Sequence, residues 1–179
     1  MKVGMNLLLW TAHVTEAHLP LCEKLKAAGF DGVELPVFEG DVAHYASLGK
    51  KLDAIGLKRT VTTVLPGPQT DFISPDAASR KAALDYMIGA IDRSAALGAE
   101  VIAGPFYQPL AHFSGNPPTD DEKARAVEGH RAAAEHAAKA GILLTVEALN
   151  RFECYLLNTI ADAAAHVRRV GHPSFKCMY

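Results

Sequence analysis

The chain has 179 residues, of which 49% are hydrophobic, and its formal net charge is -2. These values suit one soluble domain with a real core and offer no basic field for binding nucleic acid. No apolar run approaches the ~18 residues that a membrane span needs, so neither a nucleic acid nor a membrane is an expected partner.

Three cysteines, Cys22, Cys154 and Cys177, are far apart and odd in number. They have neither zinc-site spacing nor the pattern of a disulfide framework. The stretch "MKVGMNLLLW" lacks the long apolar region and the cleavage site of a signal peptide. We therefore expect reduced, mostly buried thiols in a cytoplasmic protein.

Short apolar segments alternate with amphipathic ones along the chain. Each amphipathic segment ends in a glycine, the residue that most easily takes the left-handed conformation after a helix. Thr119, followed by acidic residues, is a typical helix start, as is Asn158 or Thr159. Six strands and five helices are predicted. The strands are expected at 3–9, 32–37, 58–65, 100–106, 142–149 and 175–179, and the helix-ending glycines are Gly29, Gly56, Gly98, Gly141 and Gly171.

This alternation indicates a parallel α/β sheet built from βαβ units. An open six-stranded sheet and a (β/α)8 TIM barrel both fit the pattern. A complete barrel takes ~250 residues, and this chain ends inside a predicted strand. We favour a single domain over 1–179 that covers about the first six strands and five helices, the N-terminal two-thirds of a TIM barrel with its C-terminal part absent. No phosphate-binding glycine motif occurs.

The stretch "TVEALNRFECYLLNT", residues 145–159, changes from an apolar strand to a polar loop. Glu147 still lies within the apolar part, where a carboxylate is costly unless it is paired, hydrogen-bonded or bound to a metal. One interpretation is a structural ion pair with Arg151 or a lysine. The other is a metal ligand or acid/base group, because chemistry in barrels takes place at the strand C-termini. Glu153 alone would be interpreted as a solvated surface residue.

The motif "VEALNRFE" resembles the E-x-x-N-R-F-E signature of the ketose 3-epimerases, the D-tagatose/D-psicose group of the xylose-isomerase-like TIM barrels. "AAGFDGVEL", "IAGPFY", "VEGHRAAAEHAAKAGI" and "KCMY" extend the resemblance over essentially the whole chain. It implies an enzyme that epimerises a free ketose at C3 through an enediolate. Such an enzyme uses Mn²⁺, with Mg²⁺ or Co²⁺ as alternatives, and is a homo-oligomer, a dimer or tetramer, when full length.

The resemblance also implies roles for individual residues. Glu147 matches a metal-binding glutamate that acts as one of two acid/base carboxylates. Glu153 matches a glutamate that hydrogen-bonds the sugar, Trp10 an aromatic of the sugar pocket, and Gly104 the wall at the fourth strand. The remaining expected substrate-binding residues are Asn6 and Arg151, and Glu34 occupies a superfamily position of less defined purpose.

The chain departs from the family in three places. Asn6 stands where the better-known epimerases tend to carry an aromatic residue, and "GPFYQP" differs from the usual fourth-strand loop. An Asp-x-x-His segment follows the family's equivalent of "KCMY", and later a histidine and a glutamate complete the metal site. None of these lies within 1–179, so we expect the segment alone to be inactive.

Other functions remain open at this stage. An aldose–ketose isomerase or a hydroxypyruvate isomerase of the same superfamily would use similar residues. A catalytically incomplete fragment would bind Mn²⁺ poorly, and an apurinic endonuclease is disfavoured by the net charge of -2. Aromatic residues Phe106 and Tyr107 could line a pocket or simply pack. The loop histidines His13 and His112 are weak pocket candidates, whereas those within predicted helices are expected to be solvated or capping: His44, His130, His136 and His166.

Overall fold

The computed structural model describes residues 1–178. All six strands lie in one parallel sheet, ordered by sequence from β1 to β6. The predicted alternation of strands and helices is confirmed. The elements are β1 (Gly4–Asn6), α1 (Leu19–Ala27), β2 (Gly32–Pro36), α2 (Val42–Ile55), β3 (Lys58–Thr62), α3 (Ala77–Leu97), β4 (Val101–Gly104), α4 (Asp120–Lys139), β5 (Leu143–Glu147), α5 (Ile160–Val170) and β6 (Phe175–Met178).

The helices begin and end where local chemistry dictates. Thr119 and Thr159 each form a capping box at the start of α4 and α5, with Glu122 and Asp162 as the reciprocal partners. The five glycines predicted to follow helices all have positive φ, between 63° and 93°. A left-handed residue ends the helix and turns the chain back toward the sheet.

The strands are shorter than the sequence predicted. The segment 3–9 forms only a three-residue strand, because the chain then coils into a 3₁₀ helix over Leu7–Leu9. Glu147 is the last residue of β5, and the predicted continuation to residue 149 is irregular. Residue 179, placed in the sixth strand by the sequence, lies outside the described residues. Asn6 and Glu147 therefore lie at strand ends and Glu153 just after one, whereas Glu34 and Thr60 lie in the middle of β2 and β3.

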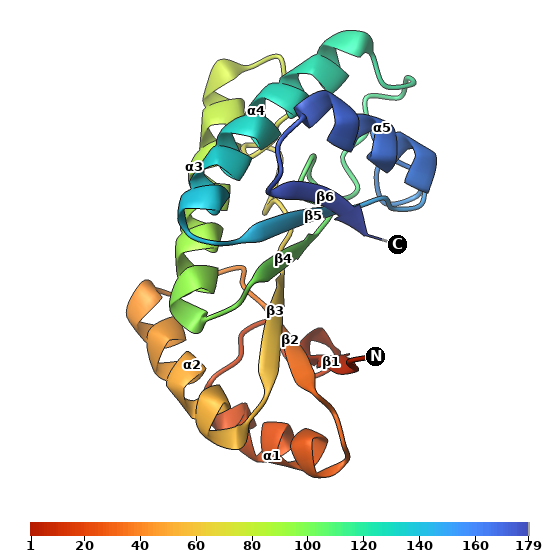
Figure 1. Cartoon of the computed structure of the whole chain (residues 1–179). Coiled ribbons are helices and arrows are strands. Elements are labelled where there is room, and N and C mark those ends of the chain that lie inside the picture. The colour runs from red at the N-terminus through yellow and green to blue at the C-terminus, as the bar shows by residue number, and fades with distance from the viewer. Residues whose placement is uncertain (179) are drawn as a thin grey trace.

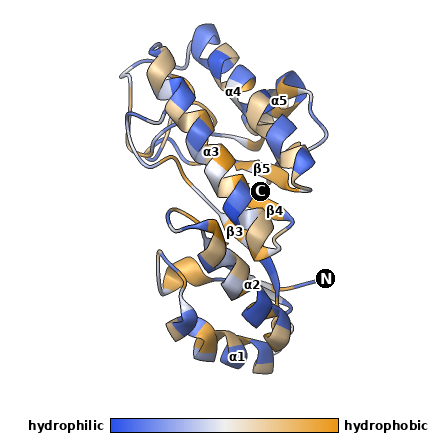
Figure 2. Cartoon of the chain, turned by 90° about the vertical axis from the view of Figure 1, so that its left-hand side faces the viewer, coloured by the Kyte–Doolittle hydropathy of each residue, from blue (hydrophilic) through white to orange (hydrophobic). Residues whose placement is uncertain are grey.

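The sheet has two different faces. Helices α2, α3 and α4 cover its convex side, while the N-terminus and the end of β6 lie toward the concave side (Figure 1). We call the convex side the outer face and the concave side the inner face. Buried aliphatic residues dominate the outer face: Val33, Leu35, Val61, Ile102, Leu144 and Val146. Seen from the helical side, β4 and β5 are largely hydrophobic (Figure 2). Fully burying each such side chain stabilises the fold by ~1.5–3 kcal/mol.

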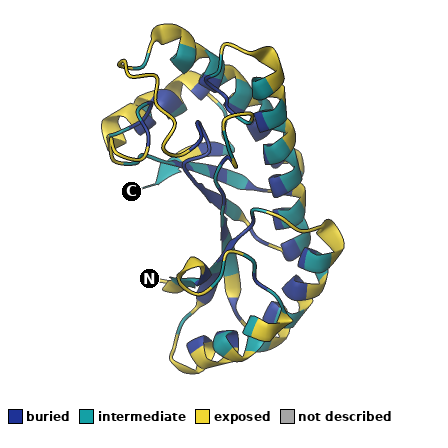
Figure 3. Ribbon diagram, turned by 180° about the vertical axis from the view of Figure 1, so that it is seen from behind, coloured by how far each residue is buried: buried dark blue, intermediate teal, exposed yellow. Residues whose placement is uncertain are grey.

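The inner face is polar. Strand pairing places Asn6 beside Glu34 and Glu34 beside Thr60, and it places Ala103 beside Thr145. Because side chains alternate along a strand, Thr62 and Glu147 share this face with them. The polar members of this set are half-buried, in contrast to the buried outer face (Figure 3). Within residues 1–178, no helix is long and apolar enough to cross a membrane.

Two of the helical histidines are buried, which corrects the expectation that they are solvated or capping. His130 in α4 is fully buried and His166 in α5 is 3% exposed. Nδ1 of His130 lies 2.7 Å from Nε2 of His166, and Nε2 of His130 lies 3.2 Å from the Phe106 carbonyl oxygen. The ring of Phe175 stacks on His130. The pair thus joins α4, α5, β6 and the loop after β4.

This histidine pair predicts acid sensitivity. Burial lowers the pKa of His166 to about 4 and lowers that of His130 well below its usual value. A depressed histidine pKa means that the unfolded chain binds more protons, so stability is full above pH ~6.5 and falls as the pH drops toward 4. For His166 alone the loss is on the order of 3 kcal/mol. Urea unfolding between pH 4 and 7.5 measures it.

The variant His166→Gln isolates the effect, since its amide can still donate a hydrogen bond to His130. We expect a flatter dependence of unfolding free energy on pH in this variant. The same change at His112, an exposed loop residue, is the control and should leave the dependence unchanged. If the unfolding free energy depended on pH equally in all three proteins, His166 would not be the source of the acid sensitivity.

Candidate functional site

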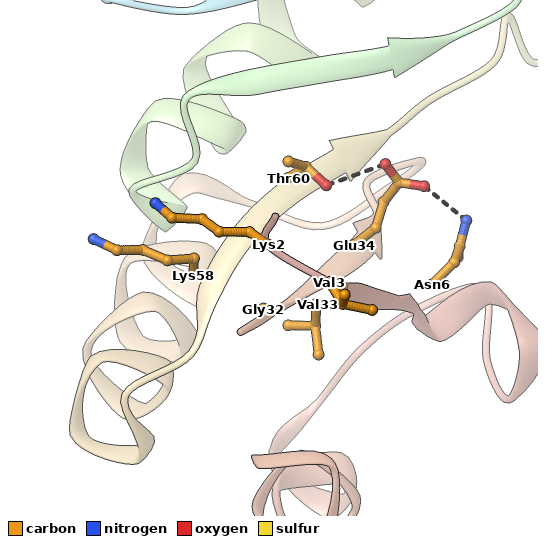
Figure 4. Close-up of a pocket in the computed structure, with 9 residues that line it drawn as sticks. Lys2, Val3, Asn6, Gly32, Val33, Glu34, Lys58 and Thr60 are labelled. Atoms are coloured by element: carbon orange, nitrogen blue, oxygen red, sulfur yellow. Dashed lines mark hydrogen bonds between the residues drawn. The ribbon is translucent and has the colours of Figure 1, made fainter. Parts of the chain in front are cut away.

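Three strands meet at the carboxylate of Glu34 on the inner face. Asn6 Nδ2 donates to Glu34 Oε1 at 2.8 Å, and the Thr60 hydroxyl donates to Oε2 at 3.1 Å. Figure 4 shows Glu34 between these two donors, with Lys2 and Lys58 farther along the same hollow. The hollow measures about 340 Å³. Both carboxylate oxygens of Glu34 are thereby hydrogen-bonded, one to each neighbouring strand.

Asn6 has a structural task of its own. Its Oδ1 accepts a hydrogen bond from the Leu8 amide at 2.8 Å and so caps the 3₁₀ helix that follows β1. Its Nδ2 is engaged by Glu34. Both ends of the amide are therefore used within the protein, which accounts for a small polar residue at this position. Substrate contact by Asn6 stays a prediction.

Glu147 lies on the same face at the end of β5. The side chain is half-buried, and burial raises its pKa. The negative charges of Glu34 and Glu153 raise it further. Within residues 1–178 Glu147 forms no ion pair, so the structural pair with Arg151 or a lysine is not formed. A carboxyl group with an elevated pKa is suited to exchanging protons near neutral pH.

Glu153 sits in an exposed turn after β5. The Asn150 side chain accepts from the Phe152 amide at 2.9 Å and donates to the Glu153 carboxylate. Glu153 is close enough to Glu147 to influence its pKa. The charges of Glu34 and Glu153 both act on Glu147, although the three residues lie on β2, at the end of β5 and in the turn after it.

Arg151 is exposed and lies over the ring of Phe152, with its guanidinium carbon 5.1 Å from the ring centre. In the described part of the chain it pairs with no carboxylate. Trp10 is 51% exposed and follows the 3₁₀ helix after β1. No contact between either residue and the three carboxylates is observed, so their substrate-binding roles stay predictions.

Gly104 is required by the backbone. Its φ is +139°, and a Cβ added there would lie 2.1 Å from the Thr63 carbonyl oxygen. The backbone segments at Gly104 and Thr63 approach each other too closely for any side chain at position 104. This steric reason holds whether or not Gly104 also forms a wall of a sugar pocket, which stays a prediction.

The other pocket candidates lie in surroundings of different kinds. Phe106 and Tyr107 are fully buried, so they pack within the core. His13 stacks on His44 with ring centres 4.8 Å apart. His112 instead lines a separate cavity of about 170 Å³ between the loops after β3 and β4. Neither histidine joins the carboxylates in a metal-binding group.

A divalent metal would need more ligands than the described residues supply. Among residues 1–178, no group of three or more histidine, cysteine, aspartate or glutamate side chains could hold a metal ion. Glu147 is a suitable single donor, because carboxylate oxygens suit Mn²⁺ and Mg²⁺. The residues present could therefore supply one ligand of a metal site, the Glu147 carboxylate.

Sequence reasoning missed the arrangement around Glu34. The signal was present in "KRTVT", residues 58–62, whose alternation places Lys58, Thr60 and Thr62 on one face. Reading the strand as simply apolar hid this polar face. The partners of Glu34 lie 28 and 26 residues away, so only the strand register reveals them.

A parallel sheet in sequential strand order, with helices between its strands, defines the class: this is an α/β protein of TIM-barrel type. The model of the xylose isomerase-like TIM barrel family matches residues 22–179, and the chain belongs to this family. The predicted fold class and family are thereby confirmed.

Its relatives are named sugar epimerases. The chain is 30% identical to a ketose 3-epimerase of Arthrobacter globiformis, covering 97% of this chain and 60% of that protein. It is 31% identical to a D-psicose 3-epimerase of Agrobacterium fabrum, covering 99% of this chain and 63% of the relative. The structure of a D-psicose 3-epimerase from Clostridium cellulolyticum H10, solved with D-tagatose, has a TM-score of 0.88 at 27% identity, covering 99% of this chain and 63% of that one. The chain thus spans just over 60% of the length of these relatives.

The close approach at Gly104 yields a stability prediction. The variant Gly104→Ala should lose roughly 3 kcal/mol or more of unfolding free energy, because the new Cβ meets backbone at a positive φ. Gly115→Ala is the matched control, since its φ is +78° but nothing lies within 4 Å. It should lose only about 1 kcal/mol. Urea denaturation of both variants measures the two losses of unfolding free energy. Similar losses in the two variants would refute the steric explanation for Gly104.

Proposed function

We propose that the chain carries one half of the acid/base machinery of a ketose 3-epimerase acting on a free sugar. The observation that carries this proposal is Glu147. It ends β5 on the inner face and is half-buried, and its pKa is raised by burial and by the charges of Glu34 and Glu153. The named epimerases that match nearly the whole chain support the same reaction.

Epimerisation at C3 breaks one C–H bond and remakes it on the opposite face of the sugar. Glu147 would accept the C3 proton, leaving an enediolate, and a second acid on the other face would return a proton. A raised pKa makes the Glu147 carboxylate a stronger base than an ordinary glutamate. Glu153 would hydrogen-bond the sugar hydroxyls. The second acid is not assigned within residues 1–178.

A divalent ion, Mn²⁺ or else Mg²⁺ or Co²⁺, belongs to this proposal as the Lewis acid that polarises the C2 carbonyl. Glu147 would be one ligand. The described residues hold no complete metal site, so the other ligands would have to come from outside them. The buried thiols of Cys22 and Cys154 agree with a cytoplasmic location. A homo-oligomer is proposed on the resemblance alone.

The position of hydrogen exchange tests the reaction. We expect the protein expressed from its full gene, with Mn²⁺ in D₂O, to place deuterium at C3 of D-fructose, D-psicose, D-tagatose or L-ribulose. An aldose–ketose isomerase would instead label C1, and NMR distinguishes the two carbons. Glu147→Gln should lower the C3 rate by ~10²–10⁴-fold, because it removes a positioned acid/base group.

The control is Glu100→Gln, an exposed glutamate just before β4 at the opposite end of the sheet. Its C3 exchange rate should match that of the unmodified protein. Label at C1 only would replace the epimerase proposal with the isomerase one. Absence of label at both carbons would reject both.

Metal binding by the isolated 179-residue chain is a separate prediction. One carboxylate cannot hold Mn²⁺ tightly against water, so titration calorimetry should detect no saturable site at micromolar metal. Glu147→Gln should leave the titration unchanged. Tight stoichiometric binding that Glu147→Gln abolishes would show that residues within the chain do assemble a complete site.

A further inference from the structure

Gln108 is a buried polar side chain in the loop after β4, and it bonds to two different loops. It is 1% exposed. Its Oε1 accepts from the Tyr155 amide at 3.1 Å and the Leu156 amide at 2.9 Å, both in the loop after β5. Its Nε2 donates to the His112 carbonyl at 2.9 Å within its own loop. A glutamine amide supplies the double acceptor and the donor from two separate atoms, which lets it reach both loops.

Two further contacts join the same loops. The Ala111 amide donates to the carbonyl oxygen of Glu153 at 2.8 Å. Ala111 holds a φ of +57°, which an alanine adopts only when its surroundings impose it. The Tyr107 hydroxyl lies 2.7 Å from the Cys154 sulfur and donates to the Leu157 carbonyl at 3.2 Å. We call this set, Tyr107, Gln108 and Ala111 with their partners, the loop clamp.

The turn that the loop clamp holds is anchored at its base within its own loop. The Asn158 side chain donates to the Leu149 and Cys154 carbonyl oxygens at 2.8 and 3.0 Å, on either side of residues 150–153. Those four residues are all exposed, and their side-chain hydrogen bonds stay within the turn. The bond from the Ala111 amide to the Glu153 carbonyl oxygen attaches the exposed part of the turn to a neighbouring loop and so helps to fix its direction relative to β5.

We propose that Gln108 is a positioning residue, which orients the turn carrying Glu153 toward the inner face where Glu147 lies. This role rests on the proposed function, in which Glu153 binds the sugar. Gln108 acts through the loop clamp and does not touch the substrate. Loss of the loop clamp would weaken substrate binding by Glu153 while leaving the proton transfer by Glu147 unchanged.

The test compares three variants of the full protein. Gln108→Leu keeps the volume and removes every hydrogen bond of the side chain. Gln108→Glu keeps the double acceptor and loses the donor, so it should partly rescue the loss. Gln69→Leu makes the same change at an exposed glutamine in the loop after β3 and is the matched control.

Two readouts are needed. Hydrogen exchange at the Ala111 amide reports the bond to Glu153, which Gln108 does not itself form. We expect about tenfold faster exchange in Gln108→Leu, close to the loss of one hydrogen bond, and no change in Gln69→Leu. In the ketose assay, KM should rise about tenfold in Gln108→Leu while kcat changes little, as for lost substrate binding. Partial unfolding would instead lower kcat at constant KM.

The outcomes separate the two proposals. Unchanged Ala111 exchange in Gln108→Leu overturns the positioning role, as does an unchanged KM in an active enzyme. If Gln108→Leu does not fold, Gln108→Glu decides, with a smaller rise in KM expected and no rise overturning the role. If the unmodified protein turns over no ketose, the proposed function fails and the positioning role fails with it. The exchange data would then describe a purely structural clamp.

Discussion

In a parallel sheet, residues paired across neighbouring strands point to the same face, and this register builds the site. It aligns Asn6, Glu34 and Thr60 so that one carboxylate receives a donor from each neighbouring strand. The same alternation brings Glu147 to that face and sends the buried aliphatic residues of β2 to β5 named above to the helices. A shift of one residue in any strand would exchange the two faces. Burial of the outer face therefore fixes the position of every inner carboxylate.

Much of the fold was predictable because its signals are local. A glycine after each helix and a threonine before α4 and α5 act within one turn of chain, and all of them are confirmed. The strand ends were less predictable. The 3₁₀ helix after β1 is capped by Asn6, whose side chain also donates a hydrogen bond to Glu34 on another strand. No window of sequence contains both partners.

The candidate site was likewise predictable only in part. Glu147 could be singled out because a carboxylate inside an apolar strand needs an explanation, and Glu153 through the motif around it. Burial raises the pKa of Glu147, and the charge of Glu34 raises it further, although Glu34 is more than 100 residues away in sequence and lies on β2, with β3 and β4 between it and β5. The burial of His130 and His166 was missed for a similar reason. Each lies on an ordinary amphipathic helix, and only the packing of α4 against α5 makes them neighbours.

The histidine pair has a further consequence, which concerns where its protons can be. The Phe106 carbonyl accepts a bond only from a protonated Nε2 of His130, so Nδ1 of the neutral ring carries a lone pair. His166 must then donate from its own Nε2. Both tautomers are fixed by a single backbone carbonyl, and the hydrogen bonds run in one direction from α5 to the loop after β4. A side chain that can only accept, such as an ionised glutamate, would face the lone pair of His130 in place of a donor. The position of His166 is thus restricted to donors by a carbonyl that it never touches.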